Sequence, residues 1–167
     1  MSASATSALD LENTIYLDLP AGRVVIQLRP DLAPGHVARI KELTRQGFYD
    51  GLLFHRVIPG FMAQTGDPQG NGTGGSGKKL KAEFSSEPHV RGTVSMARAA
   101  SPDSGDSQFF ICFDDASFLN GQYTVWGQVV TGMDFVDKIK KGSSTNNGEV
   151  SDPTKIVKMT VAADEKK

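Results

Sequence analysis

The chain of 167 residues is 22% charged and 38% hydrophobic, and it carries a formal net charge of −1. This length fits a single domain that buries about two-thirds of its unfolded surface. The balanced charge lacks the basic excess of a nucleic-acid-binding surface, and no apolar run is long enough to cross a membrane. We therefore expect neither nucleic acid nor a membrane as a partner.

Residues 1–11, rich in serine and alanine, are predicted to be a disordered lead-in. They lack the basic region and apolar core of a secretory signal. The single cysteine, Cys112, excludes an internal disulfide and gives no argument for an oxidising compartment. We expect a cytoplasmic protein whose folded domain spans 12–162 and is followed by a polar tail over 163–167.

A β-hairpin is predicted at the start of the domain. Apolar and polar residues alternate over 13–19, which is the pattern of a half-buried strand. A Pro-Ala-Gly turn at 20–22 and a second strand-like run over 23–28 complete the hairpin.

Two helices are predicted further along the chain. Apolar residues recur at helical spacing over 34–46, where Pro34 suits the first turn and Gly47 the end. A second, shorter helix is predicted from Met133 and ends at Gly142.

The remaining elements are short strands. They are predicted at 54–58, 92–97, 108–113, 123–130 and 156–161. About eight strands and two helices, without regular strand–helix alternation, argue against a doubly wound α/β fold. We expect a mainly β protein, a closed eight-stranded antiparallel barrel capped by two helices, because closure leaves no exposed strand edge.

The stretch 54–75, FHRVIPGFMAQTGDPQGNGTGG, is the most informative part of the chain. It places Arg56 and Gln64 close to the apolar side chains of Phe61 and Met62. Sites for small or peptide ligands are typically apolar pockets with a few directed polar groups. The stretch therefore predicts a ligand pocket.

Two glycine-rich patterns resemble nucleotide-binding motifs, but neither meets the requirements of such a site, so no cofactor is expected. Residues 70–75 satisfy G-x-G-x-x-G and 72–78 nearly complete a P-loop, but Lys79 stands where the P-loop needs serine or threonine. Neither pattern follows a buried strand or opens a helix, as phosphate binding requires. The three histidines show no metal-ligand spacing, so no metal is expected.

The segments FHRVIPGFMAQTGD, NGTGG, SMARA and SQFFIC, together with 118–127, resemble the cyclophilins, a family of peptidyl-prolyl cis–trans isomerases. The resemblance covers roughly residues 13–161. It implies an eight-stranded antiparallel barrel capped by two helices, rotation about X–Pro bonds during protein folding, and no cofactor. The implied partners are proline-containing peptides and unfolded or folding proteins, and we expect a monomer.

By this resemblance, Arg56 is the expected catalytic residue, which donates a hydrogen bond to the prolyl nitrogen in the twisted transition state. An apolar pocket would hold the proline ring. The residues expected to bind the substrate are Phe61, Met62, Gln64, Ala97, Arg98, Gln108, Phe110, Phe118, Leu119 and Tyr123.

Three positions depart from the family pattern. Arg98 stands where many members have asparagine. Tyr123 replaces a histidine that is common in eukaryotic members, and this replacement resembles the bacterial members. Phe118 occupies the position of a tryptophan found in cyclosporin-sensitive members. We therefore expect cyclosporin to bind with reduced affinity.

Two other functions remain open at this stage. The chain could be a prolyl-peptide binding or chaperone module with little turnover, although such a module has no need of Arg56 as a donor. Nucleotide binding would depend on the glycine loop alone.

Overall fold

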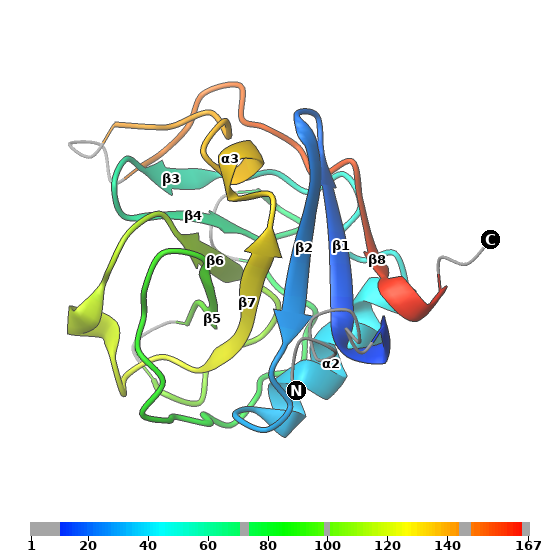
Figure 1. The fold of residues 1–167 in the computed structure, drawn as a ribbon, viewed down its shortest axis with the longest axis vertical. Helices are drawn as coiled ribbons and strands as arrows, with labels where there is room; N and C mark the ends of the chain where they lie inside the picture. Colours follow the sequence, from blue (N-terminus) through cyan, green and yellow to red (C-terminus); the bar gives the residue numbers. More distant parts are fainter. Residues whose placement is uncertain (1–10, 71–73, 99–100, 144–147, 165–167) are drawn as a thin grey trace, which may run out of the picture.

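The computed structural model describes residues 11–70, 74–98, 101–143 and 148–164. Most of the predicted lead-in, part of the predicted tail and part of the glycine loop therefore lie outside the described residues. Within the described part, eight strands form one antiparallel sheet in the order β3-β4-β6-β5-β7-β2-β1-β8 (Figure 1). No described helix is long and apolar enough to span a bilayer.

The strands are β1 (Thr14–Leu19), β2 (Gly22–Leu28), β3 (Arg56–Ile58), β4 (Met62–Thr65), β5 (Thr93–Met96), β6 (Phe109–Cys112), β7 (Val125–Thr131) and β8 (Lys158–Val161). The predicted hairpin is present as β1 and β2, with Ile15 opposite Ile26. The other predicted strands are also present, with ends that differ by one or two residues. The antiparallel mainly β architecture is thus confirmed.

The sheet is an open half-barrel, so the predicted closed barrel is wrong. The edge strands β3 and β8 share no ladder in the described part of the chain. The outer edge of β3 is instead taken by loop residues, because Val57 N–H donates to Gly148 O at 2.8 Å and Gly142 N–H donates to Val57 O at 2.9 Å. Irregular hydrogen bonds between 51–54 and 154–156 span the remaining gap, including Phe54 N–H to Thr154 O at 2.8 Å.

Two α-helices accompany the sheet and lie at opposite ends of it in Figure 1. The first, α2 (Pro34–Arg45), matches the prediction to within one residue. The second, α3 (Met133–Val136), is shorter than predicted. Beyond it, the chain tightens into i→i+3 hydrogen bonds such as Ile139 N–H to Val136 O at 3.0 Å, which end the α-helical ladder.

Three short 3₁₀ helices complete the described elements: η1 (Leu11–Asn13), η2 (Ser117–Leu119) and η4 (Ala162–Asp164). The side chain of Arg45 joins the first and last of these, because it pairs with Glu12 at 3.0 Å and with Asp164 at 2.8 Å. The two ends of the described chain therefore meet at the C-terminal end of α2.

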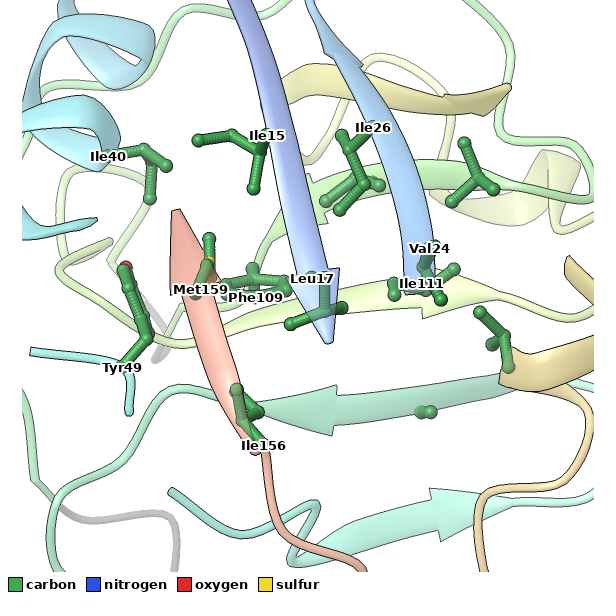
Figure 2. Close-up of a cluster of buried hydrophobic side chains, with 14 of the residues drawn as sticks. Ile15, Leu17, Val24, Ile26, Ile40, Tyr49, Phe109, Ile111, Ile156 and Met159 are labelled. Atoms are coloured by element: carbon green, nitrogen blue, oxygen red, sulfur yellow. The ribbon is translucent and has the colours of Figure 1, made fainter. Parts of the chain in front are cut away.

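An apolar core, here called the inner core, fills the concave side of the sheet. Figure 2 shows side chains from β1, β2, β6, β8, α2 and the loops at Tyr49 and Ile156 that point toward one another: Ile15, Leu17, Val24, Ile26, Ile40, Tyr49, Phe109, Ile111, Ile156 and Met159. The aromatic ring of Phe109 packs edge-on against Tyr49 and Trp126, with ring centroids 5.5 and 5.3 Å apart. The interior of the half-barrel is thus packed with apolar side chains.

Candidate functional site

The strand register sorts the side chains of β3, β4 and β6 onto two faces. Val57, Ala63 and Ile111 lie side by side and belong to the inner core. Because successive residues of a strand point to opposite faces, their neighbours Gln64 and Phe110 point outward. Gln64 and Phe110 were both predicted as site residues, and the register places them on the same face.

A second, smaller apolar cluster, here called the outer cluster, covers this outer face. Its buried members are Met62, Phe110, Cys112, Ala116 and Leu119. Burial raises the pKa of the Cys112 thiol to about 12, so it stays protonated at neutral pH. The cysteine therefore acts as a small apolar side chain.

A cavity of about 430 Å³ opens above the outer cluster. Its described lining consists of Arg56, Phe61, Met62, Gln64, Ala97, Arg98, Phe110, Phe118, Leu119, Gln122 and Tyr123. All the predicted site residues except Gln108 are among them. We call this space the outer cavity.

Arg56 reaches the outer cavity from β3 and is connected to a chain of amides. Its Nη1 donates to Gln64 Oε1 at 3.1 Å, and Gln64 Nε2 donates to Gln108 Oε1 at 2.9 Å. Gln108 Nε2 then donates to Gly74 O at 2.9 Å. Gln108 thus does not line the cavity but orients Gln64 through this hydrogen bond. The series of hydrogen bonds holds the guanidinium of Arg56 in place.

The floor of the outer cavity is the ring of Phe110. Tyr123 packs edge-on against it at 5.8 Å between ring centroids, and His89 stacks on it at 6.2 Å. The nitrogens of His89 lie 3.2 Å from Asn120 Oδ1 and 2.9 Å from Ser95 Oγ. Burial lowers the pKa of His89 and Asn120 opposes this, which favours a neutral ring beside Phe110.

The rim of the outer cavity comes from η2 and the segments around it. Phe118 is 64% exposed and tilts against Phe61 at 5.4 Å between ring centroids. Arg98, also at the cavity, donates from Nε and Nη2 to the carbonyl oxygen of Gln122, at 3.1 and 2.8 Å. The guanidinium carbon of Arg98 lies 4.6 Å from the ring centroid of Tyr123.

Gln122 is the lining residue that the sequence did not predict. Its own place at the cavity depends on the loop that follows η2, where its N–H donates to Leu119 O at 3.0 Å. The only sequence signal was its position between the predicted residues Leu119 and Tyr123.

The described part of the glycine loop is arranged against an internal carboxylate. The N–H groups of Ser76 and Gly77 donate to the Asp106 carboxylate at 2.9 and 3.0 Å. A loop whose N–H groups already bind a carboxylate offers those donors to no phosphate. Among the described residues, no group of three or more His, Cys, Asp or Glu could hold a metal ion.

A family model described as cyclophilin-type peptidyl-prolyl cis–trans isomerase matches residues 14–161. A probable peptidyl-prolyl cis–trans isomerase of Brucella suis is 60% identical, over 99% of this chain and 90% of that protein. Peptidyl-prolyl cis–trans isomerase B of Bacillus subtilis is 47% identical, over 72% of this chain and 85% of that protein.

Solved structures agree with the sequence matches. A cyclophilin from Hirschia baltica has a TM-score of 0.84 and 27% identity, over 99% of this chain and 82% of that chain. A cyclophilin-type isomerase of Cryptosporidium parvum, crystallised in the presence of the dipeptide Ala-Pro, has a TM-score of 0.80 and 26% identity. That match covers 89% of this chain and 98% of the other.

The fold, the cavity and these matches define the class of the protein, an isomerase of X–Pro peptide bonds. The chain belongs to the cyclophilin-type peptidyl-prolyl cis–trans isomerases. The resemblance found in the sequence is thereby confirmed.

Proposed function

We propose that Arg56 catalyses the isomerisation by donating a hydrogen bond to the prolyl nitrogen, while the outer cavity holds the proline ring. One observation carries this proposal. The Arg56 guanidinium lines the same cavity as the apolar side chains of Phe61, Met62, Phe110 and Leu119. An apolar surface beside a directed donor is what a proline ring and its amide nitrogen require.

The chemistry of the X–Pro bond explains why one donor is sufficient. Rotation is slow because amide resonance is lost at the twisted midpoint, a barrier of about 18–20 kcal/mol. At that midpoint the prolyl nitrogen becomes pyramidal and accepts a hydrogen bond that it cannot accept in either planar form. A donor placed there stabilises the transition state selectively.

Arginine suits this role because it is permanently charged, rigid and unable to act as a base. The hydrogen bond from Arg56 to Gln64 at 3.1 Å limits the freedom of the guanidinium before substrate arrives. A partly enclosed cavity also strengthens the interaction relative to bulk water. No covalent intermediate, metal or cofactor is needed for this step.

The required stabilisation is modest. Uncatalysed isomerisation takes about 10–100 s. Millisecond turnover needs an acceleration of about 10⁴–10⁵, which corresponds to roughly 5.5–7 kcal/mol. One charge-assisted hydrogen bond and the orientation of the ring on Phe110 supply free energies of this order.

We further propose that the substrates are exposed proline-containing segments of folding proteins. The Ala-Pro dipeptide present with the C. parvum isomerase supports this class of ligand. A cytoplasmic location and a monomeric state remain predictions.

Arg56→Ala tests the catalytic assignment. Loss of a hydrogen bond made in the transition state costs about 2–4 kcal/mol, so kcat/KM should fall roughly 30- to 1,000-fold. Arg56→Lys should recover only part of this loss, because an ammonium lacks the planar fork of donors. Arg23→Ala is the control, since Arg23 pairs with Asp18 in the β1–β2 hairpin.

The affinity for a peptide separates this mechanism from a pure binding module. If Arg56 acts only in the transition state, the Kd of Arg56→Ala for an X–Pro peptide should change far less than its turnover. A binding module predicts the reverse, with affinity lost and any slow turnover unchanged. Wild-type isomerisation by a well-folded Arg56→Ala protein would exclude the proposed mechanism.

A further inference from the structure

We propose that Arg98 is a specificity-determining residue, which makes this isomerase favour proline segments that carry an acidic side chain next to the proline. The inference rests on the proposed function, because it takes the outer cavity to be where the proline ring binds. It concerns which peptides are selected and leaves the rotation step to Arg56.

The charge of the outer cavity gives the first argument. Its described lining contains two arginines, Arg56 and Arg98, and no aspartate or glutamate. The chain as a whole has a formal net charge of −1, so this positive site is a local feature and does not reflect a basic protein. A partly enclosed site with charges of one sign favours ligands of the opposite sign.

The position of Arg98 gives the second argument. Its guanidinium makes two hydrogen bonds to the carbonyl oxygen of Gln122 and lies 4.6 Å from the ring centroid of Tyr123. These contacts hold the side chain at the rim, where it is only partly exposed. Most of the entropy that a long side chain loses on binding a carboxylate is therefore already lost.

The strand order separates the two arginines. Arg56 lies on β3 beside Gln64 of β4, and Gln64 is directly opposite Phe110 of β6. Arg98 follows β5, on the other side of β6, and contacts Tyr123, which packs on Phe110. A proline ring on Phe110 thus lies between a guanidinium that faces its amide nitrogen and one that faces the flanking residues.

Arg98 also has a structural contact, which the experiment must separate from its charge. Its hydrogen bonds to Gln122 tie down the segment that carries Phe118, Leu119 and Tyr123. Arg98→Gln removes the charge and the paired donors together. Arg98→Lys keeps the charge and loses the paired donors, so the two variants distinguish selection by charge from support of the rim.

The test is a matched set of X–Pro peptides that carry glutamate or glutamine at each of the two residues before and the two residues after the proline. For each pair, kcat/KM and Kd are measured for the wild type, Arg98→Gln and Arg98→Lys. Arg23→Gln is the matched control, because Arg23 stacks on Tyr16 at 4.3 Å in the β1–β2 hairpin, outside the cavity lining, and its substitution changes the net charge equally.

We expect the wild type to prefer glutamate over glutamine about threefold at one or more positions, the size of a partly exposed ion pair. The preference should fall toward one when salt is raised from about 0.01 M to about 1 M, because the Debye length shortens from about 30 to 3 Å. It should vanish in Arg98→Gln and persist in Arg98→Lys and Arg23→Gln.

Two results would overturn the inference. One is a wild-type ratio near one at every position, and the other is a glutamate preference that survives in Arg98→Gln, which would assign it to Arg56. Either result leaves turnover and the Arg56→Ala experiment untouched, so failure of this inference is distinguishable from failure of the proposed mechanism.

Discussion

On β4 and β6, alternate residues belong to the inner core and to the outer cluster. Phe109 and Phe110 are neighbours in β6 and are 0% and 4% exposed. Phe109 packs against Tyr49 and Trp126 inside the half-barrel, whereas Phe110 forms the floor of the outer cavity. Burial alone therefore does not separate a residue of the inner core from one that lines the outer cavity; the face of the strand does.

The difference is one of missing neighbours. A core side chain contacts protein atoms on all sides, whereas Phe110 borders a cavity on one side and so lacks the dispersion contacts that a packed neighbour would give. Under the proposed function, a proline ring would supply these contacts. The outer cluster would then be an apolar surface that is completed by substrate.

The largest effect that tests this comparison is on stability. Phe109→Ala removes a fully buried aromatic ring from the inner core, so it should lower the free energy of unfolding by about 3–5 kcal/mol. Denaturant titration at constant temperature measures this. A loss below about 1 kcal/mol would mean that the two faces of β6 do not differ as described.

Phe110→Ala should show the opposite balance. Because Phe110 is the floor of the cavity, kcat/KM should fall by about 30-fold or more, the effect of truncating a central binding residue. The free energy of unfolding should fall less than in Phe109→Ala, since Phe110 already borders empty space. If stability falls equally in both variants while activity survives in Phe110→Ala, the proline site lies elsewhere.

Phe118→Trp sharpens the comparison at the rim. An indole adds a donor and a larger ring at a position that is 64% exposed, so the affinity for cyclosporin should rise about five- to tenfold. Titration calorimetry of the wild type and the variant measures this, and stability should not change. An unchanged affinity would show that the lost indole N–H is not the cause of the expected weak binding.

The smallest effect is a pH dependence of stability that comes from His89, whose ring stacks on Phe110 of the outer cluster. Burial lowers the pKa of His89 below its ordinary value near 6.5, so the unfolded chain binds more protons in the interval between the two pKa values. Stability therefore rises with pH there, and the contribution of neutral His89 is lost as pH falls below about 6.5.

Thermal unfolding between pH 7.5 and 5 measures this contribution. The melting temperature of the wild type should fall on acidification, and His89→Gln should show a shallower fall. His36 and His55 also have a pKa lowered by burial, so part of the dependence should remain in this variant. An identical slope in the two proteins would exclude His89 as a contributor.

Local patterns carried most of what the sequence predicted correctly. The hairpin over 13–28 and the helix over 34–46 depend on alternation, turn residues and helical spacing, which are visible within short windows. The lining residues were named from a family resemblance, and the strand register then explains why Arg56, Gln64 and Phe110 meet on one face. Their roles in catalysis and binding remain predictions.

The overestimated length of α3 is a local error, whereas two other errors concern contacts between distant segments. Closure of the barrel depended on what covers the edge of β3, and this turned out to be Gly142 and Gly148 from a loop without strand periodicity. Gln122 lines the cavity because the turn after η2, closed by the hydrogen bond from Gln122 N–H to Leu119 O, places it there. Neither feature can be predicted from composition or residue spacing, since both depend on how distant segments are positioned in the folded structure.

The pairing of β1 with β8 has a consequence for how the protein is made. Ile15 pairs with Val161, so one edge of β1 stays without its partner while nearly the whole domain is synthesised. At about 5–20 residues per second, that interval is on the order of ten seconds. An unpaired edge is a template for pairing with other chains, and β1 carries the apolar Ile15, Leu17 and Leu19. During translation, this edge of β1 is therefore open to pairing with other chains.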